Sequence, residues 1–420
     1  MGGTSFNDYI AGNDSANVLR GFGGADQLRG GAGADTLDGG DGNDDLYDTA
    51  GGDRLFGGNG NDLLQGGVGA DVLNGGAGTD TAAYGASAAG VTVDLAAGTA
   101  SGGDAEGDTL TGIENLTGSA QADRFYGSAG ANTLSGGAGN DYLQGGAGAD
   151  ALNGGAGVDW IDYWDSSVGV SVNLGTGRGS GGQAQGDTIT GVENIAGSNI
   201  NDTLVGDAGV NRLNGRAGAD NLNGGAGDDQ LVGGAGADVL TGGAGYDSAL
   251  YDNASAGVTA SLASPSANTG DAAGDTYSGI EHLIGSQFAD TLTGNGASNY
   301  LYGWGGDDVL NGAGGADVLR GGAGADTFVF ASATSSAASA PDRINDFSQS
   351  QGDTIDLSGI TGGSGSFIGT AEFSGAAGEV RFVLGTTQTS VYVDADGDGT
   401  ADAQIRLMTA VTLTADDFVL

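Results

Sequence analysis

Acidic residues recur at every ninth position over long stretches of this 420-residue chain, and this spacing limits what it can fold into. The first series comprises Asp26, Asp35, Asp44, Asp53, Asp62, Asp71 and Asp80. Most copies follow the pattern GGxGxD and place an apolar residue two positions after the aspartate, as at Leu28 and Leu37. Nine residues fit a six-residue turn and a three-residue strand whose central side chain alone points inward. One inward leucine per strand builds a core only when strands stack, so the pattern predicts a solenoid.

The repeats form four blocks, at about 5–80, 123–159, 202–247 and 290–330, separated by three equivalent inserts at 81–122, 160–201 and 248–289. The later blocks continue the series with Asp141, Asp150, Asp159, Asp220, Asp229, Asp238, Asp247, Asp308, Asp317 and Asp326. Near the start of each block asparagine replaces aspartate, at Asn17, Asn132, Asn211 and Asn299. We expect the whole of 1–330 to form one repeat domain, with the inserts as extra β-coils that carry a surface loop.

The turn sequence has the chemistry of a calcium site. Its glycines permit backbone conformations that aim carbonyl oxygens at one point, and the aspartate adds a charged oxygen. Calcium takes six to eight oxygen ligands at about 2.3–2.6 Å, whereas magnesium demands a tighter octahedron. Transition metals would need histidine or cysteine, and the chain has one histidine and no cysteine. The repeat aspartates and asparagines named above are therefore the predicted calcium ligands. We expect weaker binding at the asparagines, because they are neutral.

The charge supports this interpretation. The chain has 54 acidic and 11 basic residues, for a net charge of −43. Such a chain repels nucleic acid and anionic lipid, and a compact fold requires that its own repulsion be neutralised. No stretch approaches the roughly 20 apolar residues of a membrane-spanning helix, so neither nucleic acid nor a membrane interior is an expected partner.

The pattern GGxGxDxUx, where U is apolar, resembles the repeats-in-toxin (RTX) family across about residues 5–330. The resemblance implies an all-β fold, a right-handed parallel β-roll with two short strands in each coil. It also implies a row of calcium ions along each side of the roll. Each ion would be shared by turns 18 residues apart, such as those that carry Asp26 and Asp44, or Asp35 and Asp53.

The three inserts share further acidic positions, for which the sequence allows two roles. The acids Asp108, Asp187 and Asp275 are equivalent to one another, as are Glu114, Glu193 and Glu281. They either bind calcium or close turns. Aromatic residues near the inserts and in the last block either form a sugar-stacking surface or fill roll ends and junctions: Trp160, Tyr163, Trp164, Tyr251 and Trp304.

The last ninety residues, 331–420, follow a different pattern after a Ser/Ala-rich linker. The segments FVF, INDF and GDTIDL resemble the C-terminal region of serralysin-type RTX proteins. The resemblance implies a β-rich cap that carries an uncleaved type I secretion signal, ending in Asp416-Asp417-Phe418-Val419-Leu420. The N-terminal sequence MGGTSFNDYI has neither the basic nor the apolar region of an ordinary export signal. The segment Asp394–Asp402 has acidic spacings like an EF-hand loop but lacks the twelfth-position glutamate, so it is either an acidic hairpin turn or an extra calcium site.

No catalytic motif is present: HExxH and GxSxG are absent, and all basic residues are arginine. The sequence therefore predicts a secreted, non-enzymatic protein that folds on binding several Ca²⁺ ions after type I secretion. Its expected role is structural or adhesive at the cell surface, as in an S-layer, filament or biofilm matrix. Its expected partners are the type I secretion apparatus, further copies of itself and surface polysaccharide. The alternatives are a carbohydrate-binding or enzyme-supporting module, and a hydrolase with an unrecognised active site.

Overall fold

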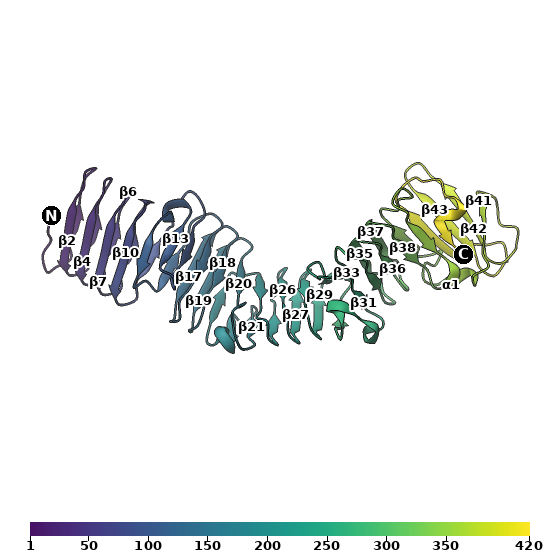
Figure 1. Cartoon of the computed structure of the whole chain (residues 1–420), viewed down its shortest axis with the longest axis horizontal. Helices are drawn as coiled ribbons and strands as arrows, with labels where there is room; N and C mark the ends of the chain where they lie inside the picture. Colours follow the sequence, from purple (N-terminus) through teal and green to yellow (C-terminus); the bar gives the residue numbers. More distant parts are fainter. The chain divides into compact units, whose positions relative to one another are not determined.

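The computed structural model describes all residues, 1–420, and contains two units, Met1–Asp207 and Ala208–Leu420 (Figure 1). Both units consist almost entirely of short β-strands joined by tight turns. The one α-helix is α1 (Ser358–Thr361), and the short 3-10 helices are η1 (Gly103–Ala105), η2 (Gly182–Ala184), η3 (Pro265–Ala267), η4 (Gly270–Ala272) and η5 (Ala415–Asp417). No helix combines the length and apolar character needed to cross a lipid bilayer.

The first unit contains the first two inserts and the coils around them. Its strands are β1 (Tyr9–Ala11), β2 (Val18–Gly23), β3 (Gln27–Arg29), β4 (Thr36–Asp41), β5 (Asp45–Tyr47), β6 (Ala50–Gly51), β7 (Arg54–Asn59), β8 (Leu63–Gln65), β9 (Val68–Gly69), β10 (Val72–Ala77), β11 (Thr81–Ala83), β12 (Thr92–Asp94), β13 (Thr99–Ser101), β14 (Thr109–Thr111), β15 (Asn115–Thr117), β16 (Arg124–Tyr126), β17 (Thr133–Ala138), β18 (Tyr142–Gln144), β19 (Ala151–Ala156), β20 (Trp160–Asp162), β21 (Ser171–Asn173), β22 (Arg178–Ser180), β23 (Thr188–Thr190), β24 (Asn194–Ala196) and β25 (Thr203–Val205).

The second unit contains the third insert, the last repeat block and the C-terminal region. Its strands are β26 (Arg212–Asn214), β27 (Asn221–Ala226), β28 (Gln230–Val232), β29 (Val239–Ala244), β30 (Ser248–Leu250), β31 (Thr259–Ser261), β32 (Thr276–Ser278), β33 (His282–Ile284), β34 (Thr291–Thr293), β35 (Tyr300–Gly305), β36 (Val309–Asn311), β37 (Val318–Ala323), β38 (Thr327–Val329), β39 (Asp342–Ile344), β40 (Thr354–Asp356), β41 (Ser366–Gly369), β42 (Glu379–Leu384), β43 (Thr389–Asp394), β44 (Ala403–Leu407) and β45 (Phe418–Val419).

Each coil of the roll contains two strands and two turns, so strands stack in parallel at a sequence separation of 18. Leu28 of β3 pairs with Leu46 of β5, and Leu37 of β4 pairs with Leu55 of β7 on the opposite sheet. These leucines are fully buried and form one column for each sheet. These parallel pairings confirm the predicted β-roll. Because each strand has one inward residue, the stacked leucines form the apolar core.

The turns require glycine at particular positions. In the turn that begins at Gly39, Gly40 has a φ of 109° and Gly42 a φ of 140°. Residues with a Cβ rarely adopt these conformations. The glycine content therefore produces the turn geometry that stacks one coil directly on the next.

Each insert interrupts the 18-residue register and then restores the roll. Leu73 of β10 pairs with Leu110 of β14, and Ala82 of β11 pairs with Leu116 of β15. Between them, β12 and β13 form an antiparallel pair, while Val93 of β12 also pairs in parallel with Phe125 of β16. The insert thus supplies strands to the roll and connects them through a short segment that contains η1.

The C-terminal region continues the roll before it changes topology. Strands β39 and β40 add to β37 and β38 in parallel, and β42, β43 and β44 form an antiparallel meander. The last strand, β45, pairs in parallel with β40. The Phe418 side chain is buried, and its ring lies 5.2 Å from that of Phe367. The chain terminus is thus packed onto the final coil of this unit.

Candidate metal sites

The repeat aspartates form continuous hydrogen-bonded rows along the roll. The backbone N–H of Asp26 donates to Oδ1 of Asp44 at 2.7 Å, and the N–H of Asp44 donates to Oδ1 of Asp62 at 2.8 Å. On the other side, Asp35 and Asp53 are joined in the same way at 2.7 Å. One carboxylate oxygen of each aspartate therefore holds two successive coils in register.

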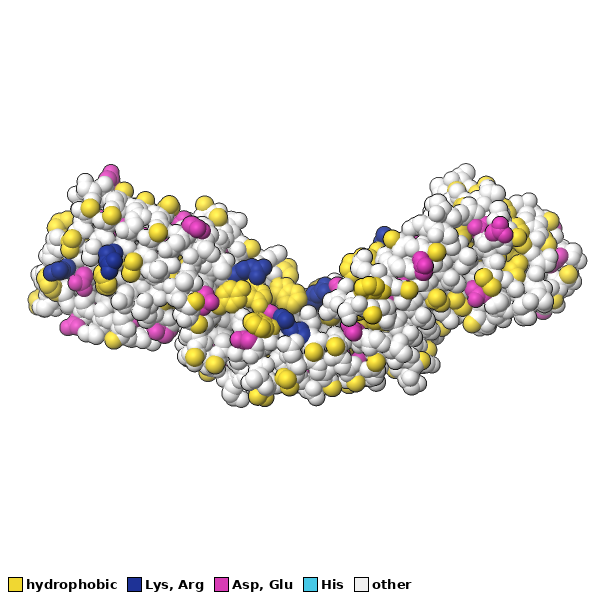
Figure 2. Space-filling view, viewed as in Figure 1, with side chains coloured by type: hydrophobic (Ala, Val, Ile, Leu, Met, Phe, Trp, Pro, Cys, Tyr) yellow, Lys and Arg dark blue, Asp and Glu magenta, His cyan; other side chains and the backbone are white.

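The second carboxylate oxygen, Oδ2, is buried and accepts no hydrogen bond at most repeat positions. This group contains Asp26, Asp35, Asp44, Asp53, Asp62, Asp71, Asp80, Asp141, Asp150, Asp159, Asp238, Asp247, Asp308, Asp317 and Asp326. Asp220 and Asp229 are equally buried and continue the rows, each donating its N–H to the aspartate 18 residues later. Figure 2 shows only scattered acidic side chains on the visible face, because the repeat carboxylates lie inside the turns. A buried carboxylate oxygen without a partner is costly unless a cation or a proton compensates it.

Burial raises the pKa of several of these carboxyl groups, and at Asp62 and Asp308 neighbouring carboxylates add to the effect. Desolvation raises the pKa of Asp62 to about 6, that of Asp317 to about 7 and that of Asp308 to about 8. The charges of Asp290 and Asp326 contribute at Asp308. The metal-free fold thus favours the protonated carboxyl, and a bound divalent cation would supply the positive charge that the carboxylate requires.

The first glycine of each turn leaves a space bounded by oxygen atoms. A Cβ placed on Gly39 would lie 2.3 Å from Oδ2 of Asp44 and 2.6 Å from the carbonyl oxygen of Gly57 in the next coil. A Cβ on Gly57 would likewise lie 2.3 Å from Oδ2 of Asp62 and 2.5 Å from the Gly75 carbonyl oxygen. A Cβ at either position would collide with these oxygens, so the first residue of the turn must be glycine. The residues present therefore fit calcium, with oxygen donors from two successive coils around a space that only glycine leaves open.

The predicted asparagine ligands have a different arrangement. Oδ1 of Asn132 accepts the N–H of Ser128 in its own turn at 2.7 Å, and its Nδ2 donates to the Glu114 carbonyl oxygen at 2.7 Å. Asn17 and Asn299 accept the same kind of bond, from Asn13 at 2.7 Å and from Asn295 at 2.8 Å. Asn211 is buried and donates its N–H to Asp229. The amide oxygens of Asn17, Asn132 and Asn299 thus each accept a hydrogen bond within their own turn, whereas Oδ2 of most repeat aspartates accepts none.

A serine closes the carboxylate that follows each insert. Oδ2 of Asp123 accepts the N–H of Ser119 at 2.6 Å, and its Oδ1 accepts the serine hydroxyl at 3.0 Å. Asp202 and Asp290 have equivalent contacts with Ser198 and Ser286. These turns begin with Gly-Ser instead of Gly-Gly, which is the sequence signal that distinguishes them.

Insert acids close the rows at the opposite end of each of the first three blocks. Asp108 accepts the N–H of Asp71 through Oδ1 at 2.8 Å and the hydroxyl of buried Tyr84 through Oδ2 at 3.1 Å. The pairs Tyr163–Asp187 and Tyr251–Asp275 repeat this contact at 2.9 and 2.7 Å. On the other side, Glu114, Glu193 and Glu281 accept the N–H groups of Asp80, Asp159 and Asp247. The structure favours turn closure over metal binding for these acids.

The rows also extend into the C-terminal region, which sequence spacing did not predict. Oδ1 of Asp342 accepts the N–H of Asp317 at 2.8 Å, and its buried Oδ2 has no partner. Oδ1 of Asp353 accepts the N–H of Asp326 at 3.1 Å. Both aspartates precede an isoleucine by two residues, as in the repeats, but the nine-residue spacing is lost. The pattern D-x-I was the available signal.

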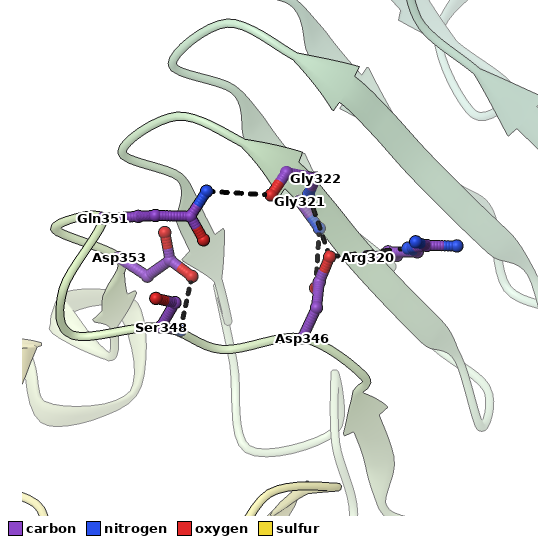
Figure 3. A network of polar contacts seen from close by, with 7 residues as sticks. All are labelled: Arg320, Gly321, Gly322, Asp346, Ser348, Gln351 and Asp353. Carbon is purple, nitrogen blue, oxygen red and sulfur yellow. Dashed lines mark hydrogen bonds and ion pairs between the residues drawn. The ribbon is translucent and has the colours of Figure 1, made fainter.

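The loop that carries Asp353 folds over the last GGAGAD turn (Figure 3). Asp346 accepts the N–H groups of Gly321 and Gly322 at 3.1 and 3.0 Å and lies 3.5 Å from the Arg320 guanidinium. The Gln351 side chain donates to the Gly322 carbonyl oxygen at 3.3 Å. These contacts cover the backbone groups that another coil would otherwise satisfy.

The segment with EF-hand-like spacing is a hairpin connection between β43 and β44. Carboxylate oxygens of Asp394, Asp396 and Asp398 lie within 4.8 Å of one another. Asp394 accepts the N–H groups of Gly397 and Gly399 at 2.8 and 2.9 Å. The hairpin turn is therefore present, and its most buried carboxylate is occupied by backbone donors.

The predicted aromatic residues differ in exposure, and Trp160 and Trp304 are half-buried. Tyr163 and Tyr251 are each 1% exposed and belong to the buried hydrogen bonds described above. Trp164 is 49% exposed and lines a groove of about 470 Å³ with Asp94, Tyr126, Gln144 and other residues of the first unit. Its indole N–H donates to the Gln144 side chain at 3.2 Å. Trp164 is thus the more exposed of the two aromatic residues that line this groove.

Comparison with known proteins gives two matching family models. Residues 184–420 match the model described as Peptidase M10 serralysin C terminal. The model described as RTX calcium-binding nonapeptide repeat (4 copies) matches residues 2–37, 21–47, 47–82, 108–143 and 126–161.

Individual proteins match over shorter stretches. The Metallopeptidase AprA of Pseudomonas marginalis is 52% identical over 125 residues, which are 29% of this chain and 26% of that protein. This chain thus spans about a quarter of the length of that relative. The solution structure of the AlgE6R3 subunit from the Azotobacter vinelandii Mannuronan C5-epimerase is 31% identical, covers 33% of this chain and 76% of that chain, and has a TM-score of 0.27.

A parallel roll of nonapeptide turns with rows of buried carboxylates defines a calcium-binding RTX repeat protein. Because the serralysin C-terminal model spans more than half of its residues, the chain belongs to the serralysin C-terminal family. It is a secreted protein whose repeats bind several calcium ions.

Proposed function

We propose that calcium binding and folding of this chain are a single event that follows secretion by a type I apparatus. The observation that carries the proposal is the row of buried carboxylate oxygens without protein partners beside the first-glycine spaces. With those spaces empty, the aspartates are desolvated and repel their neighbours along each row, as Asp44 and Asp80 repel Asp62, beside a thin leucine core. Ligand bonds to calcium then contribute the free energy that orders the coils. Because cytosolic calcium is scarce, the chain stays extended for export and folds outside.

The proposed ligands are the repeat aspartates with an unpartnered Oδ2, together with Asp220 and Asp229 of the same rows. The asparagines Asn17, Asn132, Asn211 and Asn299 remain proposed as weaker end sites, which donate an oxygen without charge. We place the cap and secretion region at 331–420, where the roll changes to an antiparallel meander. The chain's own aspartates hold the cation and set the coil register, and calcium when bound supplies the neutralising charge.

Circular dichroism of the purified chain tests this proposal. In chelator the spectrum should be that of an unfolded chain, and millimolar calcium should restore β-structure; magnesium at the same concentration should do so much less. A chain that keeps its β-structure after all divalent ions are removed would refute the coupling.

For the folded protein we propose a structural or adhesive role at the cell surface, in an S-layer, filament or biofilm matrix. The proposal assigns no catalytic step to the chain. Support comes from the equivalence of the inserts, which present the same loop around η1, η2 and η4 at intervals along the repeats. A surface that recurs in this way suits binding to other copies of the chain or to a repetitive polymer. Calcium-dependent filaments or sheets in electron micrographs would support the role, and strict monomers at high calcium would contradict it.

A second candidate function is carbohydrate binding in the Trp164 groove. Trp164 offers an exposed ring face, and the walls add the polar side chains of Asp94, Gln144 and Asp165. An aromatic face with a few convergent polar groups is the usual form of a sugar site. Binding of the calcium-loaded chain to a glycan array should be lost in Trp164→Ala. Val168→Ala, which truncates an exposed apolar residue outside the groove lining, is the matched control.

A further inference from the structure

One turn of the first block has an aspartate where the repeat has its first glycine. Asp48 begins the turn DTAGGD, which ends at Asp53, directly after β5. Asp48 is only 1% exposed. Its Oδ1 accepts the N–H of Thr49 at 2.8 Å, while its buried Oδ2 has no hydrogen-bond partner. A second charged oxygen without a protein partner is therefore buried in this turn.

The unpartnered oxygen of Asp48 points into the glycine space of the preceding coil. A Cβ on Gly30 would lie 2.1 Å from Oδ2 of Asp48 and 2.5 Å from Oδ2 of Asp35. In the ordinary turn at Gly39, the corresponding two neighbours are one carboxylate oxygen and one backbone carbonyl oxygen. A side-chain carboxylate thus takes the position that a neutral carbonyl has elsewhere in the row.

Three carboxylates converge at this point. Ligand oxygens of Asp35, Asp48 and Asp53 lie within 4.8 Å of one another, and all three residues are at most 1% exposed. None of the three forms an ion pair with an arginine. Because three like charges buried together repel strongly, the cluster needs a cation more than the ordinary sites do.

We infer that Asp35, Asp48 and Asp53 form a cation site with one more carboxylate than the ordinary sites of the roll, and that this site binds calcium first and most tightly. The inference rests on the proposed calcium-dependent folding. Calcium affinity rises with the number of charged ligands, and a trivalent ion gains more from an added carboxylate than a divalent one. Terbium(III) is therefore a suitable probe, and the ring of Tyr47, which lines the same pocket as Asp48, can sensitise its luminescence.

The test compares the full-length chain with three variants by calcium calorimetry and terbium titration. Asp48→Gly restores the repeat residue and so preserves folding, and Asp48→Asn removes only the charge. Asp38→Asn is the control, because its side chain is 47% exposed and lies outside the rows. We expect a tight first phase in wild type and in Asp38→Asn, weakened about tenfold or more in both Asp48 variants. Tyr47→Phe should remove the luminescence of that phase while leaving the calorimetric affinity unchanged.

The outcomes separate this inference from the proposed function. If wild type does not fold with calcium, the proposed function fails. If wild type and Asp48→Gly both fold with calcium and bind the first ion with equal affinity, the inference alone is overturned. It is also overturned if the tight phase weakens in Asp38→Asn as much as in the Asp48 variants.

Discussion

The Tyr84 hydroxyl donates a hydrogen bond to Oδ2 of Asp108, the same carboxylate oxygen that lacks a protein partner in the repeat aspartates. Asp108 otherwise behaves as a member of the row, because its Oδ1 accepts the N–H of Asp71. The buried Tyr84 hydroxyl therefore contacts the oxygen that is expected to bind a cation in the repeat aspartates. The equivalent pairs at Tyr163 and Tyr251 show that each insert ends one row of the metal ladder in this way.

Tyr84→Phe should destabilise the calcium-loaded chain, because it removes the donor and leaves a buried carboxylate oxygen unsatisfied. The expected loss is about 1–3 kcal/mol in the free energy of unfolding. Thermal unfolding at saturating calcium measures it. Tyr9→Phe is the matched control, since Tyr9 is 64% exposed and should change little. Equal melting temperatures for the two variants would contradict the proposed closure.

Gly39→Ala should abolish one calcium site. Gly39 does not have a positive φ, so the substitution acts through its Cβ, which would collide with two oxygens of the site. Its new Cβ would lie 2.3 Å from Oδ2 of Asp44 and so displace an oxygen that we assign as a ligand of the cation. We expect the bound calcium to fall by one ion and the melting temperature to drop. Elemental analysis of the dialysed protein gives the count.

Gly52→Ala is the control for that experiment in the same block. Its Cβ would meet nothing closer than the Ala70 carbonyl oxygen at 3.5 Å, an ordinary contact. The assignment of the cation to the first-glycine space is wrong if Gly39→Ala and Gly52→Ala retain the same amount of calcium.

Acidification should stabilise the metal-free fold and destabilise the calcium-loaded one. Burial raises the pKa of Asp62 to about 6, that of Asp48 to about 7 and that of Asp308 to about 8, from an unfolded value near 3.8. A carboxyl group whose pKa is raised by folding stabilises the fold fully when the pH is below the pKa of the unfolded chain. This stabilisation is lost as the pH rises through 6–8, the folded-state pKa values. Calcium needs the deprotonated carboxylate, so protons compete with it.

Metal-stripped protein should therefore gain β-structure in circular dichroism between pH 8 and pH 4.5, whereas the midpoint of calcium titrations should shift to higher concentration over the same range. The calcium-loaded sample serves as the internal control. A metal-free spectrum that does not change with pH would show that the buried carboxyls do not control folding.

Asp342→Asn should weaken calcium binding in the second unit, although Asp342 lies outside the nine-residue series. The amide can still accept the N–H of Asp317, but the buried oxygen loses its charge. We expect one site to weaken by about tenfold or more in calorimetry. Asp416→Asn, at an exposed position near the C-terminus, should bind calcium as wild type does. Unchanged binding in Asp342→Asn would confine the rows to the repeats.

Phe418→Ala should loosen the last coil, because the ring is buried against Phe367 and its strand β45 pairs with β40. The expected cost is about 3–5 kcal/mol. Hydrogen exchange of the β40 amides should accelerate. Val419→Ala is the control, since Val419 is 46% exposed. Equal exchange in both variants would mean that the terminus does not stabilise the cap.

The nine-residue period was sufficient to predict the stacked coils and the residues of the two rows. A strand with one inward leucine has no stable partner except its own repeat, so Leu28 must lie above Leu46 in any compact form. The glycine turns and the absence of cysteine likewise determined that the ligands are oxygens. The stacked coils depend on local geometry that recurs with the sequence, and the structure confirms them, whereas the oxygen ligands stay a prediction.

Contacts between residues far apart in sequence decided the rest. The N–H of Asp71 donates to Asp108, 37 residues later, and the N–H of Asp80 donates to Glu114, 34 residues later. Neither sequence separation follows from the nine-residue period. Whether a carboxylate oxygen faces a tyrosine hydroxyl, as at Asp108, or an empty glycine space, as at Asp44, depends on how each insert folds back onto the roll. The cluster of Asp48 with Asp35 is likewise a tertiary contact, because Asp35 belongs to the preceding coil. The sequence by itself determined the roll and its oxygen-rich turns, whereas only the tertiary structure decided which of those oxygens lack a protein partner, because that depends on contacts between distant segments.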